Sequence, residues 1–376
     1  MRFKCFSSTW QHCLLNDCVI FLDEQRKPIK ETDRKKIKGE YPYYGASGII
    51  DNINSYIFDD DLILLSEDGA NILDRNYRVS FIVRGKIWVN NHAHVLKPKN
   101  KIDINYLSEY LENLDYAKYN TGSAQPKLNQ DVCKNITINI PDYNEQQKIG
   151  KFLSIINQRI DTQSKIIEDL ELFEKEINNT IINKLVEHKD LVKFSSLYNF
   201  AKEGGTPNTS HFEYYTKGSI PFVKIDDLTT KYLVSNQSFI TKLGLENSSA
   251  WLIPANSILY SNGATIGAIS INKYPVTTKQ GILGIVPKSD YLSEYLYYFL
   301  RSNYFKKEIC KITTQGTMKS VYIKDIDNIL VPHLNKNQQN EILTLLSEIT
   351  LKIQKEKDML ELYKKQKAYL LKNMFI

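Results

Sequence analysis

The chain has 376 residues, of which 42% are apolar and 24% are charged, and its formal net charge is +6. These totals are ordinary for a soluble globular protein with room for more than one core, and the mild positive charge permits an anionic partner without requiring one. Five cysteines without a C-x-x-C pair argue against a zinc site or a disulfide framework, and no apolar run suits a membrane span or a signal peptide. We therefore expect a cytoplasmic protein.

Short motifs of the first half return in the second half. An apolar run at 63–70 ends in a polar turn with Gly-Ala, as does the run at 258–264. The hexapeptide YLSEYL follows at 106–111 and again at 291–296. Next, 136–141 alternates like a strand and ends in proline, and a similar run ends at Pro332. Because the order of the matched features never changes, we interpret the chain as a repeated domain.

Each half ends in a proline-free stretch with helical periodicity. In residues 145–187 and 337–376, apolar residues recur at spacings of three and four, which places them on one face of a helix. A helix of about 40 residues is roughly 60 Å long, so it rarely lies inside a small globule. We expect the two apolar stripes to pack as a coiled coil whose seam is interrupted by Gln163, Lys352 and Gln366. The alternative is that each helix packs on a different protein.

The charges divide unevenly between these parts. The two helical stretches together carry as many basic as acidic residues, so the whole net charge lies on the globular parts. This is the direction expected if the globular parts contact nucleic acid and the helices do not.

The motifs of several enzyme classes are absent from the sequence. There is no Pro-Pro dipeptide, which the Asn/Asp-Pro-Pro-aromatic motif of amino-methyltransferases requires, no P-loop or dinucleotide loop, and no H-E-x-x-H. Asp142 is better interpreted as a helix cap than as part of a nuclease cluster. His92 and His94 could share one face of a strand, but no third metal ligand is evident nearby, so a polar surface patch or a phosphate contact is the preferred interpretation.

Four segments of the first half resemble one protein family closely. They are YPYYGASGIID at 41–51, LLSEDGANI at 64–72, WVNNHAH at 88–94 and GSAQPKLN at 122–129. Together with residues 140–149 and the closing LLKNMFI, they resemble the specificity (S) subunits of type I restriction-modification systems. The resemblance covers nearly the whole chain in the expected order.

This resemblance implies an α+β fold with two pseudo-repeated target recognition domains, each reading one half of a split DNA site. Two long helices would form an antiparallel coiled coil that separates the domains. The expected divisions are a first recognition domain at 1–144, a helical spacer at 145–187, a second recognition domain at 188–336 and a second spacer at 337–376.

The same resemblance implies a subunit without catalytic activity of its own. It would be the scaffold for two methyltransferase subunits and for the restriction subunits that translocate DNA. We expect no cofactor in this chain, and S-adenosylmethionine, ATP and Mg only on the partner subunits. The second half has no evident equivalent of Tyr-Tyr-Gly-Ala-Ser-Gly and instead carries residues 203–207 and 220–224. Such a difference between domains suggests unlike half-sites.

Candidate DNA contacts are polar, basic or aromatic side chains near the expected turns of both halves. Asn and Gln can pair bidentately with adenine, and Lys can reach guanine or phosphate. In the first domain the candidates are Tyr43, Tyr44, Asn91, His92, Ser123, Gln125, Lys127 and Asn129. In the second they are Asn262, Lys279, Gln280, Gln315, Thr317, Lys319 and Ser320. The alternative interpretation is that Tyr43 and Tyr44 belong to the core and that the Gly-Ser and Gly-Thr pairs only form turns.

Other functions remain open at the level of sequence. A coiled-coil adaptor with two protein-binding lobes would bind proteins and would not bind duplex DNA. A solitary nuclease or methylase is disfavoured by the missing motifs. The sequence does not distinguish a type I subunit from a fused relative with similar recognition domains, nor does it give the bases that are read or the length of the spacer.

Overall fold

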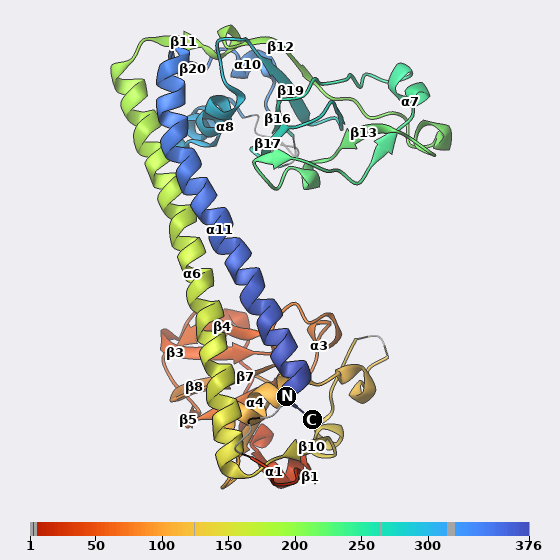
Figure 1. The fold of residues 1–376 in the computed structure, drawn as a ribbon, viewed down its shortest axis with the longest axis vertical. Coiled ribbons are helices and arrows are strands. Elements are labelled where there is room, and N and C mark those ends of the chain that lie inside the picture. Colours follow the sequence, from red (N-terminus) through yellow and green to blue (C-terminus); the bar gives the residue numbers. More distant parts are fainter. Residues whose placement is uncertain (1–2, 4–5, 124, 264, 314–319, 376) are drawn as a thin grey trace. The chain divides into compact units, whose positions relative to one another are not determined.

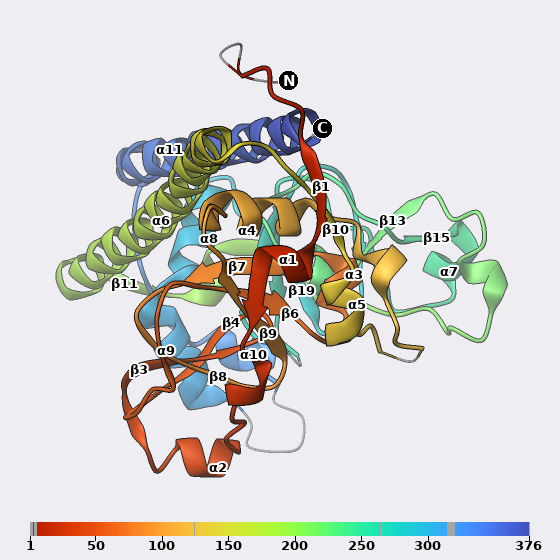
Figure 2. The ribbon, with the colours of Figure 1, turned by 90° about the horizontal axis from the view of Figure 1, so that it is seen from below.

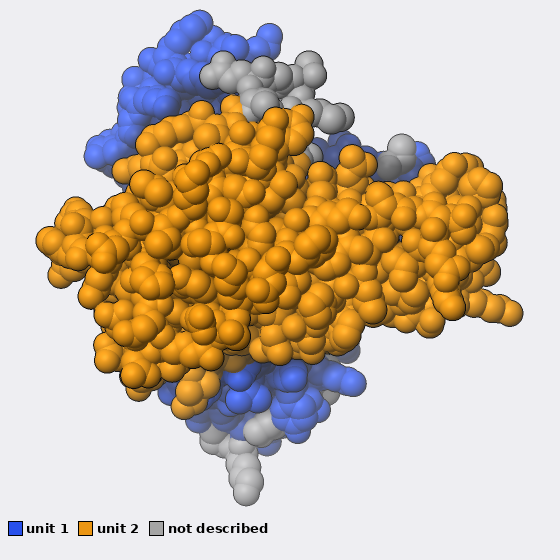
Figure 3. Space-filling model, turned by 90° about the horizontal axis from the view of Figure 1, so that it is seen from above, with its two compact units in different colours: residues 1–165, 357–376 blue, residues 166–356 orange. Residues whose placement is uncertain are grey.

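The structure, a computed structural model, describes residues 3, 6–123, 125–263, 265–313 and 320–375. The chain forms two compact units, residues 1–165 with 357–376 and residues 166–356 (Figure 3). Two long helices, α6 (Tyr143–His188) and α11 (Lys336–Met374), each contribute one part to each unit (Figure 1). None of the helices in the described part of the chain has a stretch long and apolar enough to cross a membrane.

The first unit contains a four-stranded antiparallel sheet. Its order is β2 (Val19–Phe21), β9 (Ala93–Pro98), β6 (Leu62–Ser66) and β7 (Ser80–Val83). All residues of β6 are buried, because successive side chains face two different cores. Ile63 and Leu65 pack with helix α4 (Ile104–Asn113), whereas Leu62 and Leu64 pack with the second sheet.

The second sheet of this unit covers the other face of the first. Its order is β4 (Gly48–Ile53), β3 (Lys38–Gly45), β8 (Lys86–Val89) and β5 (Phe58–Asp59), with β3 parallel to β8. A separate ribbon pairs β1 (Gln11–Leu14) with β10 (Thr137–Ile140), and the two strands lie side by side in Figure 2. The short helices are α1 (Leu15–Cys18), α2 (Glu31–Arg34), α3 (Asn71–Asp74) and α5 (Gln130–Lys134).

The second unit is built from the same parts. Its larger sheet has the order β12 (Tyr198–Glu203), β19 (Ile282–Pro287), β16 (Ile258–Ser261), β17 (Ile269–Asn272) and β14 (Tyr232–Leu233). The smaller sheet has the order β15 (Phe239–Ile240), β13 (Ile220–Val223) and β18 (Thr277–Thr278). The ribbon pairs β11 (Leu191–Lys193) with β20 (Leu330–Pro332). The helices are α7 (Lys242–Glu246), α8 (Ser293–Arg301), α9 (Asn303–Ile312) and α10 (Ile323–Ile326).

The strand registers confirm the internal repeat. Ile63 pairs with Ile82 and Leu96, and Ile258 pairs with Ile271 and Ile285 in the same topology. The parallel pair β3–β8 has its counterpart in β13–β18. Residues 220–223 therefore occupy the position of 41–44. The segment that appeared to be missing from the second half is present in the fold with a different sequence.

The repeated hexapeptide is not in structural register. The Tyr106 hydroxyl donates to the Asn139 carbonyl at 2.5 Å, and the equivalent bond in the second unit runs from Tyr295 to Pro332 at 3.2 Å. Tyr106 is the first letter of the first YLSEYL, but Tyr295 is the fifth letter of the second. The two strings thus differ by four residues, about one helical turn. The domain repeat is correct, although its most visible sequence signal lies at non-equivalent positions.

A buried glutamine fixes the first turn of each long helix to its domain. Gln146 donates through Nε2 to the carbonyls of Lys101 at 3.2 Å and Pro141 at 3.0 Å, and its Oε1 accepts the Asp103 N–H at 3.0 Å. Gln339 makes the same three bonds, to the carbonyls of Asp290 and Leu334 and from the N–H of Leu292. Each side chain thus satisfies three backbone groups, one of which, the carbonyl of Pro141 or Leu334, belongs to a buried residue.

Within each unit the parts of α6 and α11 share one hydrophobic core. In the first unit, Ile149 and Leu153 of α6 and Leu370 and Met374 of α11 belong to the core that contains α4. In the second unit, Ile182 of α6 and Leu346 of α11 belong to the core that contains α8. Since the start of α6 shares a core with the end of α11, and the reverse holds in the other unit, the helices pair antiparallel, as expected.

The polar interruptions of this pairing differ from the expected ones. Gln163 is buried, whereas Lys352 and Gln366 are exposed and lie outside the buried face. A buried ionic contact is present instead, in which Glu109 of α4 pairs with Lys367 of α11 at 3.1 Å. The two helices begin and end within two residues of the expected stretches. The assignment of 1–144 and 188–336 as recognition domains stays a prediction.

We predict that Gln146→Ala lowers the free energy of unfolding by about 2–4 kcal/mol, because it removes three hydrogen bonds and leaves the carbonyl of the buried Pro141 without this partner. Urea unfolding followed by circular dichroism measures this loss. Gln147→Ala is the matched control, since Gln147 is the exposed neighbour in the same helical turn. Equal stability of the two variants would contradict the role assigned to Gln146.

Candidate nucleic-acid interface

Four loops of the first unit meet at one end of its two sheets. The Glu67 N–H donates to the His92 carbonyl at 2.9 Å, and the Leu128 N–H donates to the Glu67 carbonyl at 2.7 Å. The Ser66 hydroxyl donates to the Ala46 carbonyl at 2.6 Å. These bonds join the β3–β4 hairpin, the segment after β6, the turn after β8 and the segment before α5. We call residues 45–50, 66–69, 90–92, 120–123 and 125–129 the first loop cluster.

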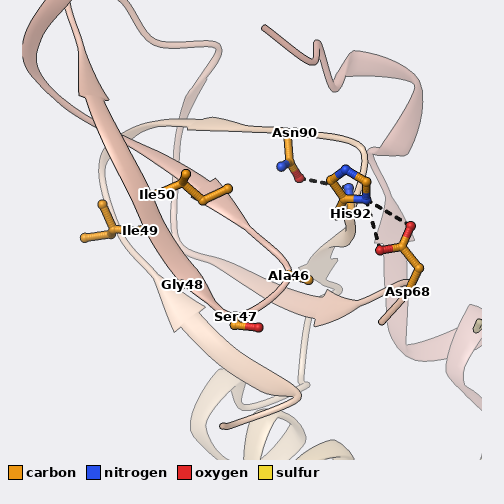
Figure 4. Close-up of a pocket in the computed structure, with 8 residues that line it drawn as sticks. All are labelled: Ala46, Ser47, Gly48, Ile49, Ile50, Asp68, Asn90 and His92. Atoms are coloured by element: carbon orange, nitrogen blue, oxygen red, sulfur yellow. Dashed lines mark hydrogen bonds and ion pairs between the residues drawn. The ribbon is translucent and has the colours of Figure 1, made fainter. Parts of the chain in front are cut away.

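A cavity of about 270 Å³ opens on this cluster (Figure 4). Its lining residues are Ala46, Ser47, Gly48, Ile49, Ile50, Asp68, Asn90 and His92. His92 Nδ1 lies 2.9 Å from both carboxylate oxygens of Asp68, and its backbone N–H donates to Asn90 Oδ1 at 2.8 Å. Ile50 packs over Gly45, where a Cβ would lie only 2.3 Å from its Cδ1. The cavity combines an apolar wall with an oriented imidazole.

A buried ion pair supports the cluster from beneath. His94 and Asp23 are 1% and 8% exposed, and His94 Nδ1 lies 2.6 Å from Asp23 Oδ2. The other ring nitrogen lies 2.8 Å from the Leu128 carbonyl. Because both partners are acceptors, both ring nitrogens must carry hydrogen, and His94 is an imidazolium. The remaining Asp23 oxygen accepts the Val95 N–H at 2.8 Å, so β9, the short 3-10 helix Asp23–Gln25 and the segment before α5 are tied together.

The pKa of His94 follows from these contacts. Burial acts to lower it, but hydrogen bonds to Asp23 and Cys133, together with the charges of these two groups, outweigh burial and raise the pKa to about 10. The hydrogen bond from His94 lowers the pKa of Asp23 against its own burial. Arg26 extends the network, since it donates to Glu67 at 2.6 Å and to the Ala93 carbonyl at 2.8 Å. The cluster is thus held by charged groups rather than by turns alone.

The predicted contacts of the first domain divide by exposure. Six of them are exposed in or beside the first loop cluster, namely Asn91, His92, Ser123, Gln125, Lys127 and Asn129. Tyr44 is half-buried, and burial raises its pKa. Tyr43 is 1% exposed and its hydroxyl accepts the Ile29 N–H, which favours the alternative interpretation of this residue as part of the core.

The second unit repeats the same loop geometry. The Lys279 N–H donates to the Val223 carbonyl at 2.9 Å, as the Asn90 N–H does to Tyr44. The Asn262 N–H donates to the Gly281 carbonyl, and the Val321 N–H donates to the Asn262 carbonyl, each at 3.0 Å. We call residues 223–224, 261–263, 279–281 and 320–321 the second loop cluster.

The predicted contacts of the second domain are less uniform. Lys279 and Gln280 are exposed, and Ser320 is half-buried. Asn262 is 4% exposed and donates through Nδ2 to the Val321 carbonyl, so it supports the cluster from within. Gln315, Thr317 and Lys319 lie outside the described residues.

The sequence did not identify Asp23, Arg26 and Glu67, which support the first loop cluster. The expectation that His92 and His94 share one face of a strand is also wrong. His92 and His94 have separate acidic partners, Asp68 and Asp23, and one is half-exposed while the other is buried. No group of three potential metal ligands occurs among the described residues. His94 lies 71 residues from Asp23, so no local spacing pointed to the pair.

Comparison with known proteins identifies relatives over most of the chain. A family model for the type I restriction modification DNA specificity domain matches residues 7–172 and 183–362. A putative type I restriction enzyme specificity subunit of Haemophilus influenzae is 26% identical over 355 residues, which cover 89% of this chain and 86% of that protein. An S subunit of a type I restriction-modification system from M. genitalium has the same fold, with a TM-score of 0.59 at 14% identity and coverage of 100% and 99%. A second structure, from work on complex assembly of the type I system, gives a TM-score of 0.60 at 14% identity over 98% of both chains.

The ion pair of His94 predicts a dependence of stability on pH. Its folded pKa of about 10 exceeds the ordinary value of 6.5, so its contribution is complete below about pH 6.5 and is lost as the pH rises toward 10. We expect His94→Gln to cost about 3 kcal/mol at pH 6.5 and progressively less at higher pH. Urea unfolding at several pH values measures this difference. His92→Gln is the exposed control, and a constant difference between wild type and His94→Gln would refute the charged state.

Proposed function

The chain belongs to the family of type I restriction modification DNA specificity domains, and from this premise we propose that it is the sequence-specific DNA-binding subunit of a type I restriction-modification complex. Each domain reads one half of a bipartite site in duplex DNA. The family and the relatives are those of specificity subunits, so the chain itself is non-catalytic.

The observation that carries the proposal is the duplication of one loop framework with different exposed side chains. The same backbone bonds hold residues 90–92 and 279–281, yet the sequences are Asn-Asn-His and Lys-Gln-Gly. A repeated scaffold with unlike surfaces suits a protein that reads two unlike half-sites. Phosphate contacts would supply most of the affinity, and base edges would supply the specificity.

The long helices supply the second part of the proposal. Each is continuous and belongs partly to both units. We assign them two tasks, to set the spacing between the half-sites and to provide the surface on which partner subunits assemble. The partners are two methyltransferase subunits and the restriction subunits. S-adenosylmethionine, ATP and Mg then belong to those partners.

The proposal is tested by mapping DNA methylation. The chain is co-expressed with the methyltransferase of its own system, and adenine methylation is read across the host genome at single-base resolution. We expect one split motif with two defined halves and a fixed gap. If an intact complex that is active with another specificity chain gains no new motif, the DNA-reading role is wrong. Binding to protein partners that does not change with salt would then favour the coiled-coil adaptor.

Lengthening both helices should change the gap and leave the half-sites unchanged. Seven helical residues inserted after Lys165 and again after Glu356, at the limits of the two units, add about 10 Å to each helix. At roughly 3.4 Å per base pair, the gap should grow by about three base pairs. Methylation mapping reads the gap directly. The same insertion in α6 alone serves as the control, because it disrupts the pairing, and an unchanged gap in the double insertion would refute the spacing role.

A further inference from the structure

The turns after β8 and β18 are fixed at three equivalent points. The N–H of the first residue donates to the neighbouring strand, from Asn90 to Tyr44 and from Lys279 to Val223. The carbonyl of the third residue, His92 or Gly281, accepts an N–H from the segment after β6 or β16. We call residues 90–92 and 279–281 the reading turns.

The third fixed point is a side-chain acceptor, which differs between the domains. The His92 N–H donates to Asn90 Oδ1 at 2.8 Å, whereas the Gly281 N–H donates to Glu203 Oε1 at 2.7 Å. The same backbone N–H is therefore held in both turns, although the side chains that hold it and the backbone conformation of the third residue differ. Gly281 has a φ of +90°, which glycine adopts without strain. Two unrelated side chains thus anchor the third residue of the two turns.

The middle residue of each reading turn carries a carboxamide. Asn91 and Gln280 occupy equivalent positions, and both are exposed. Within the described part of the chain, neither side-chain amide has a hydrogen-bond partner, although the backbone on both sides is fixed. Because the backbone is already fixed, only the side chain loses conformational entropy when the carboxamide binds. Such a group can pair with both the N6 and N7 atoms of adenine in the major groove.

We propose that Asn91 and Gln280 each read one adenine, in the first and second half-site respectively. This inference rests on the proposed function and names the base edge that each domain recognises. The flanking side chains distinguish the two half-sites. In the first domain the neighbours are the imidazole of His92, held by Asp68, and the apolar wall of Ile49 and Ile50, which suits a thymine methyl group.

In the second domain the flanking group is a cation. Lys279 is exposed, and among the described residues its ammonium makes no ion pair. Lysine at this place can reach O6 and N7 of guanine. The first half-site is therefore expected to contain an adenine next to a thymine. The second half-site is expected to contain an adenine next to a guanine.

The test uses isosteric changes that convert the amide into a carboxylate. A carboxylate accepts a hydrogen bond from N4 of cytosine and repels the adenine N7 acceptor. Asn91→Asp and Gln280→Glu are each placed in the whole chain, and the complex is assembled with its methyltransferase. Methylation is then mapped across the host genome as for the wild type. Asn16→Asp and Gln237→Glu, at exposed amides outside the loop clusters, are the controls.

We expect Asn91→Asp to disfavour one adenine of the first half-site by about tenfold or more and to favour cytosine there. Gln280→Glu should do the same in the second half-site, and each change should leave the other half-site intact. An unchanged motif, or a change in the opposite half-site, would overturn the assignment. If the wild type gives no split motif, the specificity role has failed instead, so the two failures are distinguishable.

A second measurement covers a variant that methylates nothing. The affinity of the variant complex is measured for four duplexes that carry the bipartite site of the wild type. The duplexes differ only at the base pair that is assigned to the substituted turn. A shift of preference from A·T to C·G at that pair supports the assignment. Equal weakening on all four duplexes overturns it.

Discussion

The structure depends on the attachment of each long helix to the domain before it, and one buried glutamine makes that attachment. Gln146 and Gln339 each bond three backbone groups at the point where a strand ends, a helix begins and the loop before α4 or α8 passes by. Helical propensity alone does not orient a helix relative to a sheet. Three directional bonds from one side chain do, and the pairing of α6 with α11 in each unit follows from that orientation.

The two domains keep one framework and stabilise it with different chemistry. The first uses the buried pair of His94 and Asp23, with Arg26 and Glu67 around it. The second has neutral Asn262 at the position of Glu67 and uses Glu203 to hold its turn. The framework groups are buried or half-buried, whereas the variable groups are exposed. Sequence change at the surface can therefore proceed without loss of the loop geometry, provided that each buried polar group retains a partner.

The repeat, the long helices and the family were predictable from the sequence. Helical periodicity depends on residues that are close in the sequence, and the order of the motifs is read directly along the chain. Long-range polar contacts were not, because nothing local connects His94 to Asp23 or Gln146 to Lys101. Exposure was also unpredictable for residues at strand ends. Tyr43 and Asn262 were candidate DNA contacts in the sequence, yet both side chains are buried. The equivalence of 41–44 with 220–223 required strand registers, since the two sequences share only a proline.

The shifted hexapeptide has a consequence for recombination between the two halves of the gene. Identical strings are natural crossover points, but a crossover within YLSEYL would give one product with four surplus residues and a reciprocal product with four residues missing. The junction would place Tyr106 at the position of Tyr291. The loop that carries the acceptor of Gln339, the Asp290 carbonyl, would then be displaced by about one helical turn. Productive exchange of domains must instead align Tyr106 with Tyr295, where the sequences agree less and the hydrogen bonds agree fully. The repeated hexapeptide is therefore a poor junction for chimeric proteins. The two domains are better aligned by their equivalent hydrogen bonds than by sequence identity.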